Sequence, residues 1–369
     1  EFLAEKGRLN YRMHNKLFVA DNATALIGGR NIGDPYFQVD PSAQYADDDV
    51  FVAGPLVPKL SATFDDYWNS SLAIPVQALP GSKPSQSKLE RERKRLDEHL
   101  SAARQVGADF LKRAEQGDPL AGIIAGRLPV VWARAQIVCD PPDKKAVVDG
   151  SARGRLMYGP VADASKAVSS DFIMVTPYLV PSPDELQLLR SLRQHNVRVR
   201  ILTNSLNSTN ELAAHTGYRR YRTQLLQEGV EIYELRAVLG SNRGSGQPAK
   251  MTRYGNYGLH AKLIVFDRKK LFAGSMNFDQ RSRRLNTETG LIIDSSELAA
   301  QTAARFEAMT QLSNSYEVAL QSPDSPKSPL IWRTKENDKI VEYHKEPSRS
   351  EWRRLAVDFL SVLPLDKDL

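Results

Sequence analysis

The order of hydrophobic and polar positions along the chain predicts short strands that alternate with helices. In the first part, residues 11–31 indicate two strands joined by a turn, residues 49–53 a third strand and residues 56–71 a helix. Further strands are predicted at 172–180, 197–204, 229–235, 258–267, 271–277 and 291–294, and helices at 184–194, 211–228 and 297–312. Strands that alternate with helices in this way are typical of an α/β fold.

Composition shifts divide the chain into units. A charged segment with a thin apolar stripe predicts an exposed helical insertion at about 80–115, inside a first domain that covers 1–150. A second domain is predicted over 151–320. Residues 321–369 are expected to form a Pro/Ser-rich linker and an amphipathic tail. The tail segment 352–364 either lies at a membrane interface or packs as a terminal helix on the second domain, and we favour packing.

The 369 residues carry a formal net charge of +6, are 25% charged and 41% apolar, and include one cysteine. These values exclude a collagen-like chain, a disordered tail and a disulfide scaffold. No run of about 18 apolar residues predicts a membrane-spanning helix. The chain opens without Met or a signal pattern, so an upstream signal or anchor stays undetermined. Basic residues gather in 236–253 and 281–284, which suits nucleic acid, anionic lipid or simply a solvated surface.

A repeated motif carries the candidate chemistry. His14-x-Lys16 with Asp21 reappears, at the same spacing, as His260-x-Lys262 with Asp267. In both copies a glycine and an asparagine follow at equal distances, and a carboxylate lies at a following strand: Gly28, Asn31 and Asp49 in the first copy, and Gly274, Asn277 and Glu288 in the second. A lone histidine is usually a core or surface residue, but two matched copies are not expected by chance. We therefore assign both histidines to a functional site.

Strand geometry predicts which of these side chains face that site. Residues i and i+2 of a strand project to the same side, so each histidine lies beside its lysine. The aspartates at i+7, Asp21 and Asp267, face away, and we expect a structural hydrogen-bonding role for them. The remaining motif residues have two expected roles. The small residues let an anion come close, and they are Gly28, Gly29, Gly274 and Ser275. The side-chain amides of Asn31 and Asn277 donate hydrogen bonds to that anion.

Paired together, the two copies predict one pocket that stabilises a tetrahedral phosphate without a metal or another cofactor. One imidazole can attack phosphorus while the other protonates the leaving oxygen. A carboxylate would hold the other nitrogen of each ring and fix its tautomer, and Asp49 and Glu288 are the candidates. A zinc site built from His14, His260 and acids is the weaker interpretation, because a lysine at i+2 places a positive charge where the cation would sit.

From about residue 10 onward, these residues resemble the duplicated HKD motif of the phospholipase D superfamily. The segments most similar to bacterial cardiolipin synthases of the C type are 176–182, 201–210, 215–222, 229–235, 277–291, 343–347 and 352–364. The resemblance implies two pseudo-symmetric α/β domains, each a mixed β-sheet flanked by helices, that share one central active-site cleft. Because few residues precede the first motif and a whole α/β unit precedes the second, we expect the first domain to lack its opening strands in this chain.

The resemblance also implies a two-step phosphatidyl transfer through a phosphohistidine, with His14 as the nucleophile and His260 as the acid/base catalyst. The residues themselves do not order the two. The implied substrates are phosphatidylglycerol and a second phospholipid, such as phosphatidylethanolamine, at a membrane surface, with a peripheral location on the bacterial inner membrane. Cardiolipin synthesis is the expected reaction, and hydrolysis by water is the first alternative. A nuclease acting on nucleic acid is less favoured, because compact HKD nucleases often carry one motif per chain. A non-catalytic lipid scaffold is disfavoured, because both motif copies are intact.

Three further residues are candidate substrate contacts. Asn204 ends a predicted strand, at the end where ligand sites of α/β sheets often gather. His215 and Tyr218, at i and i+3, share one face of a predicted helix. Simple packing is the alternative for these side chains.

Overall fold

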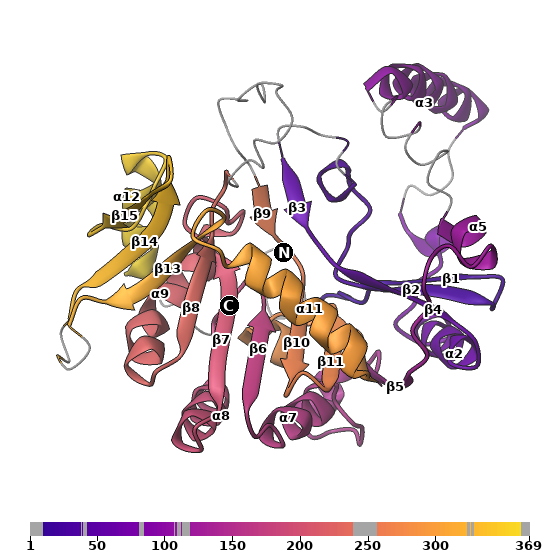
Figure 1. Ribbon diagram of the computed structural model, residues 1–369. Coiled ribbons are helices and arrows are strands. Elements are labelled where there is room, and N and C mark those ends of the chain that lie inside the picture. The colour runs from indigo at the N-terminus through magenta and orange to yellow at the C-terminus, as the bar shows by residue number, and fades with distance from the viewer. Residues whose placement is uncertain are drawn as a thin grey trace.

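A large mixed sheet and a smaller antiparallel sheet lie side by side in the computed structural model (Figure 1). The structure describes residues 10–37, 39, 43–80, 85–106, 108, 112, 119–238, 257–322, 325 and 328–362. The predicted α/β fold is confirmed. Among the described residues, no helix combines the length and apolar character that are needed to cross a membrane.

The large sheet forms most of the molecule. Its strands, in spatial order, are β15 (Lys339–Tyr343), β14 (Leu330–Glu336), β13 (Ser315–Leu320), β8 (Glu231–Leu235), β7 (Arg198–Asn204), β6 (Asp171–Val175), β10 (Leu263–Phe266), β11 (Lys270–Gly274), β12 (Thr289–Asp294) and β5 (Arg134–Cys139). The central strands β6, β7 and β8 are parallel, and the pairings outside them are antiparallel. The near-continuous apolar sequence of β6 fits a strand that is buried on both faces.

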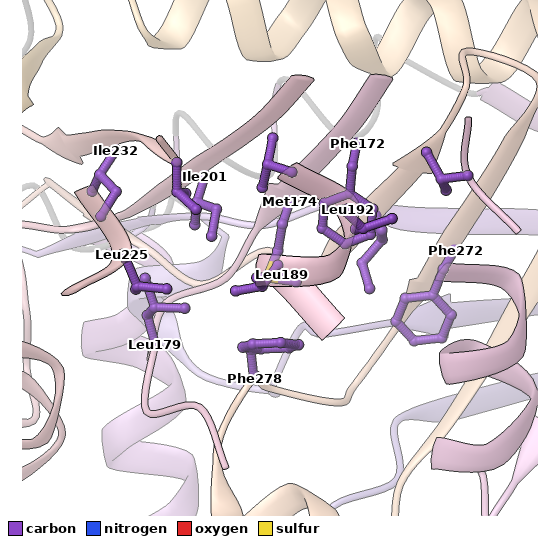
Figure 2. Close-up of a cluster of buried hydrophobic side chains, with 14 of the residues drawn as sticks. Phe172, Met174, Leu179, Leu189, Leu192, Ile201, Leu225, Ile232, Phe272 and Phe278 are labelled. Atoms are coloured by element: carbon purple, nitrogen blue, oxygen red, sulfur yellow. The ribbon is translucent and has the colours of Figure 1, made fainter. Parts of the chain in front are cut away.

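Helices cover both faces of this sheet. The helices of the chain are α2 (Val57–Trp68), α3 (Gln86–Val106), α5 (Pro119–Ile124), α6 (Lys144–Val148), α7 (Tyr158–Lys166), α8 (Pro183–Gln194), α9 (Leu212–Gln227), α10 (Gln280–Arg284), α11 (Ser296–Met309) and α12 (Glu351–Ser361), with short 3-10 turns at Asp34–Tyr36 and Val76–Ala78. Helices α7, α8 and α9 enclose the cluster of buried side chains in Figure 2, which includes Phe172, Leu189 and Ile201. On the opposite face α11 inserts Ala299, Ala303 and Phe306.

Helix α8 begins where its sequence directs. Pro183 occupies the first turn, and Ser182 and Glu185 form a reciprocal capping box in which each side chain accepts a hydrogen bond from the other residue's backbone N–H. Asn196, in the left-handed conformation at φ 60°, follows the end of the helix.

The smaller sheet repeats part of the large one. It consists of β1 (Leu17–Ala20), β2 (Thr24–Gly28) and β4 (Asp49–Ala53), and α2 packs against it. Leu17 pairs with Ile27 as Leu263 pairs with Ala273, so β1–β2 and β10–β11 have the same register relative to the motif histidines. Strand β10 also pairs with β6, whereas no described residue forms a strand on that side of β1.

The large sheet includes strands from outside the predicted second domain. Strand β5 lies within the predicted first domain, yet it pairs with β12 and ends the large sheet, because its alternating side chains complete the core beneath that edge. The segment predicted to be linker and tail contributes β14 and β15 to the other edge of the large sheet before α12 begins. The charged insertion contains α3, which stands apart from both sheets (Figure 1). Part of the insertion and most of the basic stretch 236–253 lie outside the described residues.

Candidate active site

The two motif copies meet through the backbone. The parallel pair β3 (Gln44–Ala46) and β9 (Tyr257–Leu259) joins Ala46 to Leu259, the residue before His260. In the mirror arrangement, Met13, the residue before His14, forms a bridge with Thr287. The backbone N–H of His260 donates to Ala46, and that of His14 donates to Thr287. Each histidine is therefore held beside a segment of the other copy.

His14 is oriented by a carboxylate from the second copy. Its Nδ1 lies 2.8 Å from Oε2 of Glu288, which is fully buried. The hydroxyls of Ser275 and Ser282 donate to the two oxygens of that carboxylate, at 2.5 and 2.7 Å. These bonds fix the carboxylate, which in turn leaves Nε2 of His14 as the reactive ring nitrogen.

His260 is oriented by a carboxylate from the first copy. Its Nδ1 lies 2.6 Å from Oδ2 of Asp47, which is 5% exposed. The Nζ of Lys262 lies 3.0 Å from the same Nδ1 and also donates to the His260 carbonyl. The rings of Tyr36 and Tyr45 pack beside the imidazole, with centroids 5.0 and 6.1 Å away. Nε2 of His260 is again the nitrogen left for chemistry.

Asp49 does not hold a histidine, which corrects the prediction. Its carboxylate instead binds the guanidinium of Arg30, with Oδ2 2.5 Å from Nε. Sheet register explains the difference. Gly28 pairs with Asp49 just as Gly274 pairs with Gly290, so the structural counterpart of Glu288 is the residue two positions before Asp49, which is Asp47. Side chains two apart on a strand share a side, so the sequence alone did not distinguish the two.

Burial lowers the pKa of both motif lysines, because a buried ammonium group loses hydration. The pKa of Lys262 falls to about 7, with Lys16 as a further lowering charge and Asp47 and Glu288 opposing it. The pKa of Lys16 falls to about 8, and the same two carboxylates oppose the shift. The electrostatic coupling of both lysines to both carboxylates indicates that the four groups share one site.

Burial also lowers the pKa of His260, to about 4, and the positive charge of Lys262 adds to the effect. Burial disfavours a charged Asp47, but the hydrogen bond from His260 and the charge of Lys262 together hold its pKa below the ordinary value. In the unliganded protein His260 is therefore neutral and Asp47 ionised at neutral pH.

The two motif asparagines have different surroundings. Asn31 is exposed and donates to the hydroxyl of Tyr36, whose ring packs beside His260. Asn277 is 7% exposed, its backbone N–H donates to Ser282, and its side-chain oxygen has no hydrogen-bond partner among the described residues.

The motif glycines leave space that other protein atoms occupy, whereas the sequence suggested that an anion would occupy it. A Cβ on Gly28 would lie 2.3 Å from Oδ1 of Asp49, and one on Gly274 would lie 2.5 Å from the Thr289 carbonyl oxygen. A Cβ on Gly29 would lie 2.6 Å from Oδ1 of Asp47. These positions let the strands, and the site carboxylate, come close together.

Asp267 stabilises the start of strand β6. Its carboxylate accepts hydrogen bonds from the backbone N–H groups of Ser169, Ser170 and Asp171 where β6 begins, and its pKa falls to about 2. These bonds to the charged form outweigh its partial burial. Asp21 occupies the matching hairpin turn with the same left-handed backbone, at φ 51°.

Asn204, His215 and Tyr218 do not offer polar atoms to the catalytic groups. The amide of Asn204 donates to Pro177 and Leu259 and accepts from the Leu259 N–H, so it positions the strand before His260. His215 bonds Glu346, and Tyr218 donates to Glu234. Both belong to a buried polar cluster between α9 and the C-terminal segment, where a helix face that looks amphipathic from sequence is covered.

A buried ion pair that sequence reasoning missed supports Glu288. Lys144 is 2% exposed, and its Nζ donates at 2.7 Å to Asp140 and to the carbonyls of Ser282 and Asn286. Asp140 in turn accepts from the backbone N–H of Glu288. The spacing Asp140-x-x-x-Lys144 was the available signal, although such i, i+4 pairs usually lie on a surface.

Two arginines of the basic run Arg281–Arg284 hold neighbouring segments in place. Arg281 donates to the carbonyl of Asn10. Arg283 bonds Ser182 and Asp184, and its guanidinium lies 4.6 Å from the ring centroid of Tyr158.

Comparison with known proteins shows the family of the chain. A family model described as "Cardiolipin synthase, PLD-like domain" matches residues 162–310. Cardiolipin synthase C of Escherichia coli is 33% identical over 367 residues, which cover 99% of this chain and 75% of that protein. A cardiolipin synthase of Alkalihalophilus pseudofirmus is 24% identical over 281 residues, which cover 76% of this chain and 42% of that protein.

Among solved structures, phosphatidylserine synthase of Haemophilus influenzae matches with a TM-score of 0.57 and 15% sequence identity, over 97% of this chain and 71% of that chain. This likeness concerns the fold. The fold and the paired motifs define an enzyme of the phospholipase D superfamily. Within it, the chain belongs to the family of bacterial cardiolipin synthases.

Proposed function

We propose that the protein is a phosphatidyl transferase that makes cardiolipin from phosphatidylglycerol and a second phospholipid, at the surface of the bacterial inner membrane. The observation that carries the proposal is the exchange of carboxylates between the motif copies, Glu288 to His14 and Asp47 to His260. This exchange directs the Nδ1 atoms away from the substrate and leaves two Nε2 atoms for one phosphodiester. The 33% identity to cardiolipin synthase C supports the lipid as substrate.

In the first step, Nε2 of His14 attacks phosphorus with its lone pair. The bond from phosphorus to the departing alcohol oxygen breaks, and His260 gives that oxygen a proton. In the second step, neutral His260 takes the proton of the incoming hydroxyl, whose oxygen attacks phosphorus and breaks the phosphorus–nitrogen bond. Lys16 and Lys262 offset the negative charge that gathers on the phosphoryl oxygens.

The low pKa of His260 has a consequence for this sequence of steps. In the empty site His260 is neutral at pH 7, because its pKa is about 4. A bound phosphodiester anion opposes the positive charges of Lys16 and Lys262, and so it raises the pKa of His260 toward the range of a general acid. Substrate binding and protonation of His260 are therefore coupled.

Mixed micelles with labelled phosphatidylglycerol, with and without phosphatidylethanolamine, test the function. We expect labelled cardiolipin together with glycerol or ethanolamine. Phosphatidic acid as the sole product would identify a hydrolase, and cleavage of single-stranded DNA without lipid turnover would identify a nuclease.

Mass spectrometry of quenched reactions tests the order of the histidines. We expect the phosphatidyl group on the peptide that contains His14. A modified peptide containing His260 would reverse the two roles.

A further inference from the structure

The C-terminal helix α12 exposes an apolar stripe that none of the described residues covers. The helix packs on α9 with Val357 fully buried. On the far side, Trp352, Leu355, Phe359 and the C-cap residue Val362 are 81, 56, 68 and 79% exposed. At about 100° per residue these four positions fall within an arc of about 80°, opposite Val357. Figure 1 places α12 at the end of the molecule farthest from α3.

The charges around the stripe are predominantly basic. The acids on its edge, Glu351 and Asp358, are paired with Arg354 and Arg219. The basic side chains of residues 345–358, together with two in the middle of α9, are Lys345, Arg349, Arg353, Arg354, Arg219 and Arg220, and they outnumber the three acids Glu346, Glu351 and Asp358. Arg353 lies on the packed side of α12. An apolar stripe with Trp and Phe beside excess positive charge is the pattern of helices that lie in the interface of an anionic membrane.

A cavity of about 330 Å³ opens between α9, β14 and α12. Arg219, Lys345 and Arg354 line it together with Arg222, which is 3% exposed. The Arg222 guanidinium lies 4.8 Å from the ring centroid of Trp332, and its Nε has no hydrogen-bond partner among the described residues. Glu346 and Asp358 also line the cavity, and Arg222 is paired with Glu234 and Glu346. The donor that remains for a phosphate oxygen is therefore the Arg222 Nε–H.

We propose that this face, which we call the α12 surface, docks on an anionic phospholipid bilayer, with the apolar stripe among the headgroups and the basic cavity on a lipid phosphate. The proposal deepens the lipid function proposed above and rests on it. A second copy of the chain is the poorer occupant, because a twofold contact would bring two sets of cations together.

The docking helix is joined by hydrogen bonds to a segment that leads to the active site. The guanidinium of Arg353 donates to the carbonyls of Leu206 and Thr209, in the segment between β7 and α9. At the start of that segment, Asn204 holds the backbone of Leu259, next to His260. A bilayer bound by α12 is therefore held at a defined position relative to the catalytic cleft.

Flotation with vesicles of phosphatidylglycerol and phosphatidylcholine tests the surface. The double variant W352S/F359S removes the two large exposed rings, and we expect its partition coefficient to fall at least about tenfold. The variant K345Q should weaken binding to these vesicles and leave binding to pure phosphatidylcholine unchanged. The matched control is Trp132→Ser, whose side chain is 88% exposed ahead of β5, and it should bind like the unmodified protein.

Unchanged binding of W352S/F359S, or an equal loss in W132S, would overturn the proposal. A lipid-free self-association that disappears in W352S/F359S would show that a second copy occupies the surface and would overturn it as well. Turnover in detergent micelles, where no bilayer is needed, should be the same for W352S/F359S and the unmodified protein. If the unmodified protein binds vesicles through α12 but makes no cardiolipin in micelles, the proposed function fails while the α12 surface stands.

Discussion

Replacement of Asp47 by Asn tests whether Asp47, as in the structure, or Asp49, as the sequence suggested, holds a motif histidine. Asp47 accepts the Nδ1 hydrogen of His260 at 2.6 Å and is 5% exposed, so its charge is poorly screened. A hydrogen bond to a charged group is worth about 2–3 kcal/mol. If this amount is lost in the transition state, kcat falls roughly 30- to 150-fold. Loss of the correct tautomer as well moves the effect toward about 10⁴-fold.

The assay is cardiolipin formation in mixed micelles, with thermal unfolding measured on the same samples. Asp49→Asn is the matched control, because Asp49 lies two residues away but pairs with the partly exposed Arg30. We expect D49N to keep kcat within about fivefold, since such pairs contribute about 0–1 kcal/mol. The reasoning is refuted if D49N loses as much activity as D47N, or if D47N is fully active.

The charge change also predicts a pH effect. Asp47 raises the pKa of Lys262, which burial lowers to about 7. Without that negative charge the pKa of Lys262 falls further, so less of the lysine is protonated at pH 7. The residual activity of D47N should therefore have its optimum at lower pH than the activity of the unmodified enzyme. An unchanged pH profile would show that Asp47 does not set the charge of Lys262.

Three further predictions concern stability and the buried polar groups. Lys144→Met leaves Asp140 charged and unpaired, so urea unfolding should show a loss of about 3–5 kcal/mol, and a loss below 1 kcal/mol would contradict the buried pair. Because the native pKa of His260 is about 4 against 6.5 in the unfolded chain, the unfolded chain binds more protons between these values. The free energy of unfolding should then fall by up to about 3 kcal/mol from pH 7 to pH 4, and H260N should lack this part of the decrease. His215→Gln removes a bond to Glu346 away from the catalytic groups, so it should lower the unfolding temperature and leave kcat in micelles unchanged, whereas a selective loss of kcat would return His215 to the site.

The sequence by itself determined the parts of the site that depend on local spacing. The i, i+2 rule predicted that each histidine lies beside its lysine, and in the second copy Nζ of Lys262 does lie 3.0 Å from Nδ1 of His260. Both motifs lie just before a strand, ahead of β1 and β10, rather than within one. The two copies have equal spacing, and the registers of β1–β2 and β10–β11 are equal relative to the motif histidines. Glu288 was also identified as a carboxylate that can hold a histidine, and it bonds His14.

Tertiary structure decided what depends on contacts between distant segments. Asp47, rather than Asp49, meets His260 because the register of β2 on β4 and the pairing of β3 with β9 together set that position. The pKa of Lys262 is lowered because the elements packed around it remove water from the ammonium group. A local sequence pattern does not show which elements these are. His215 looked like a pocket residue until the C-terminal segment covered it with Glu346, 131 residues away. Spacing along a strand follows from backbone geometry, whereas partners and burial follow from how the whole chain packs.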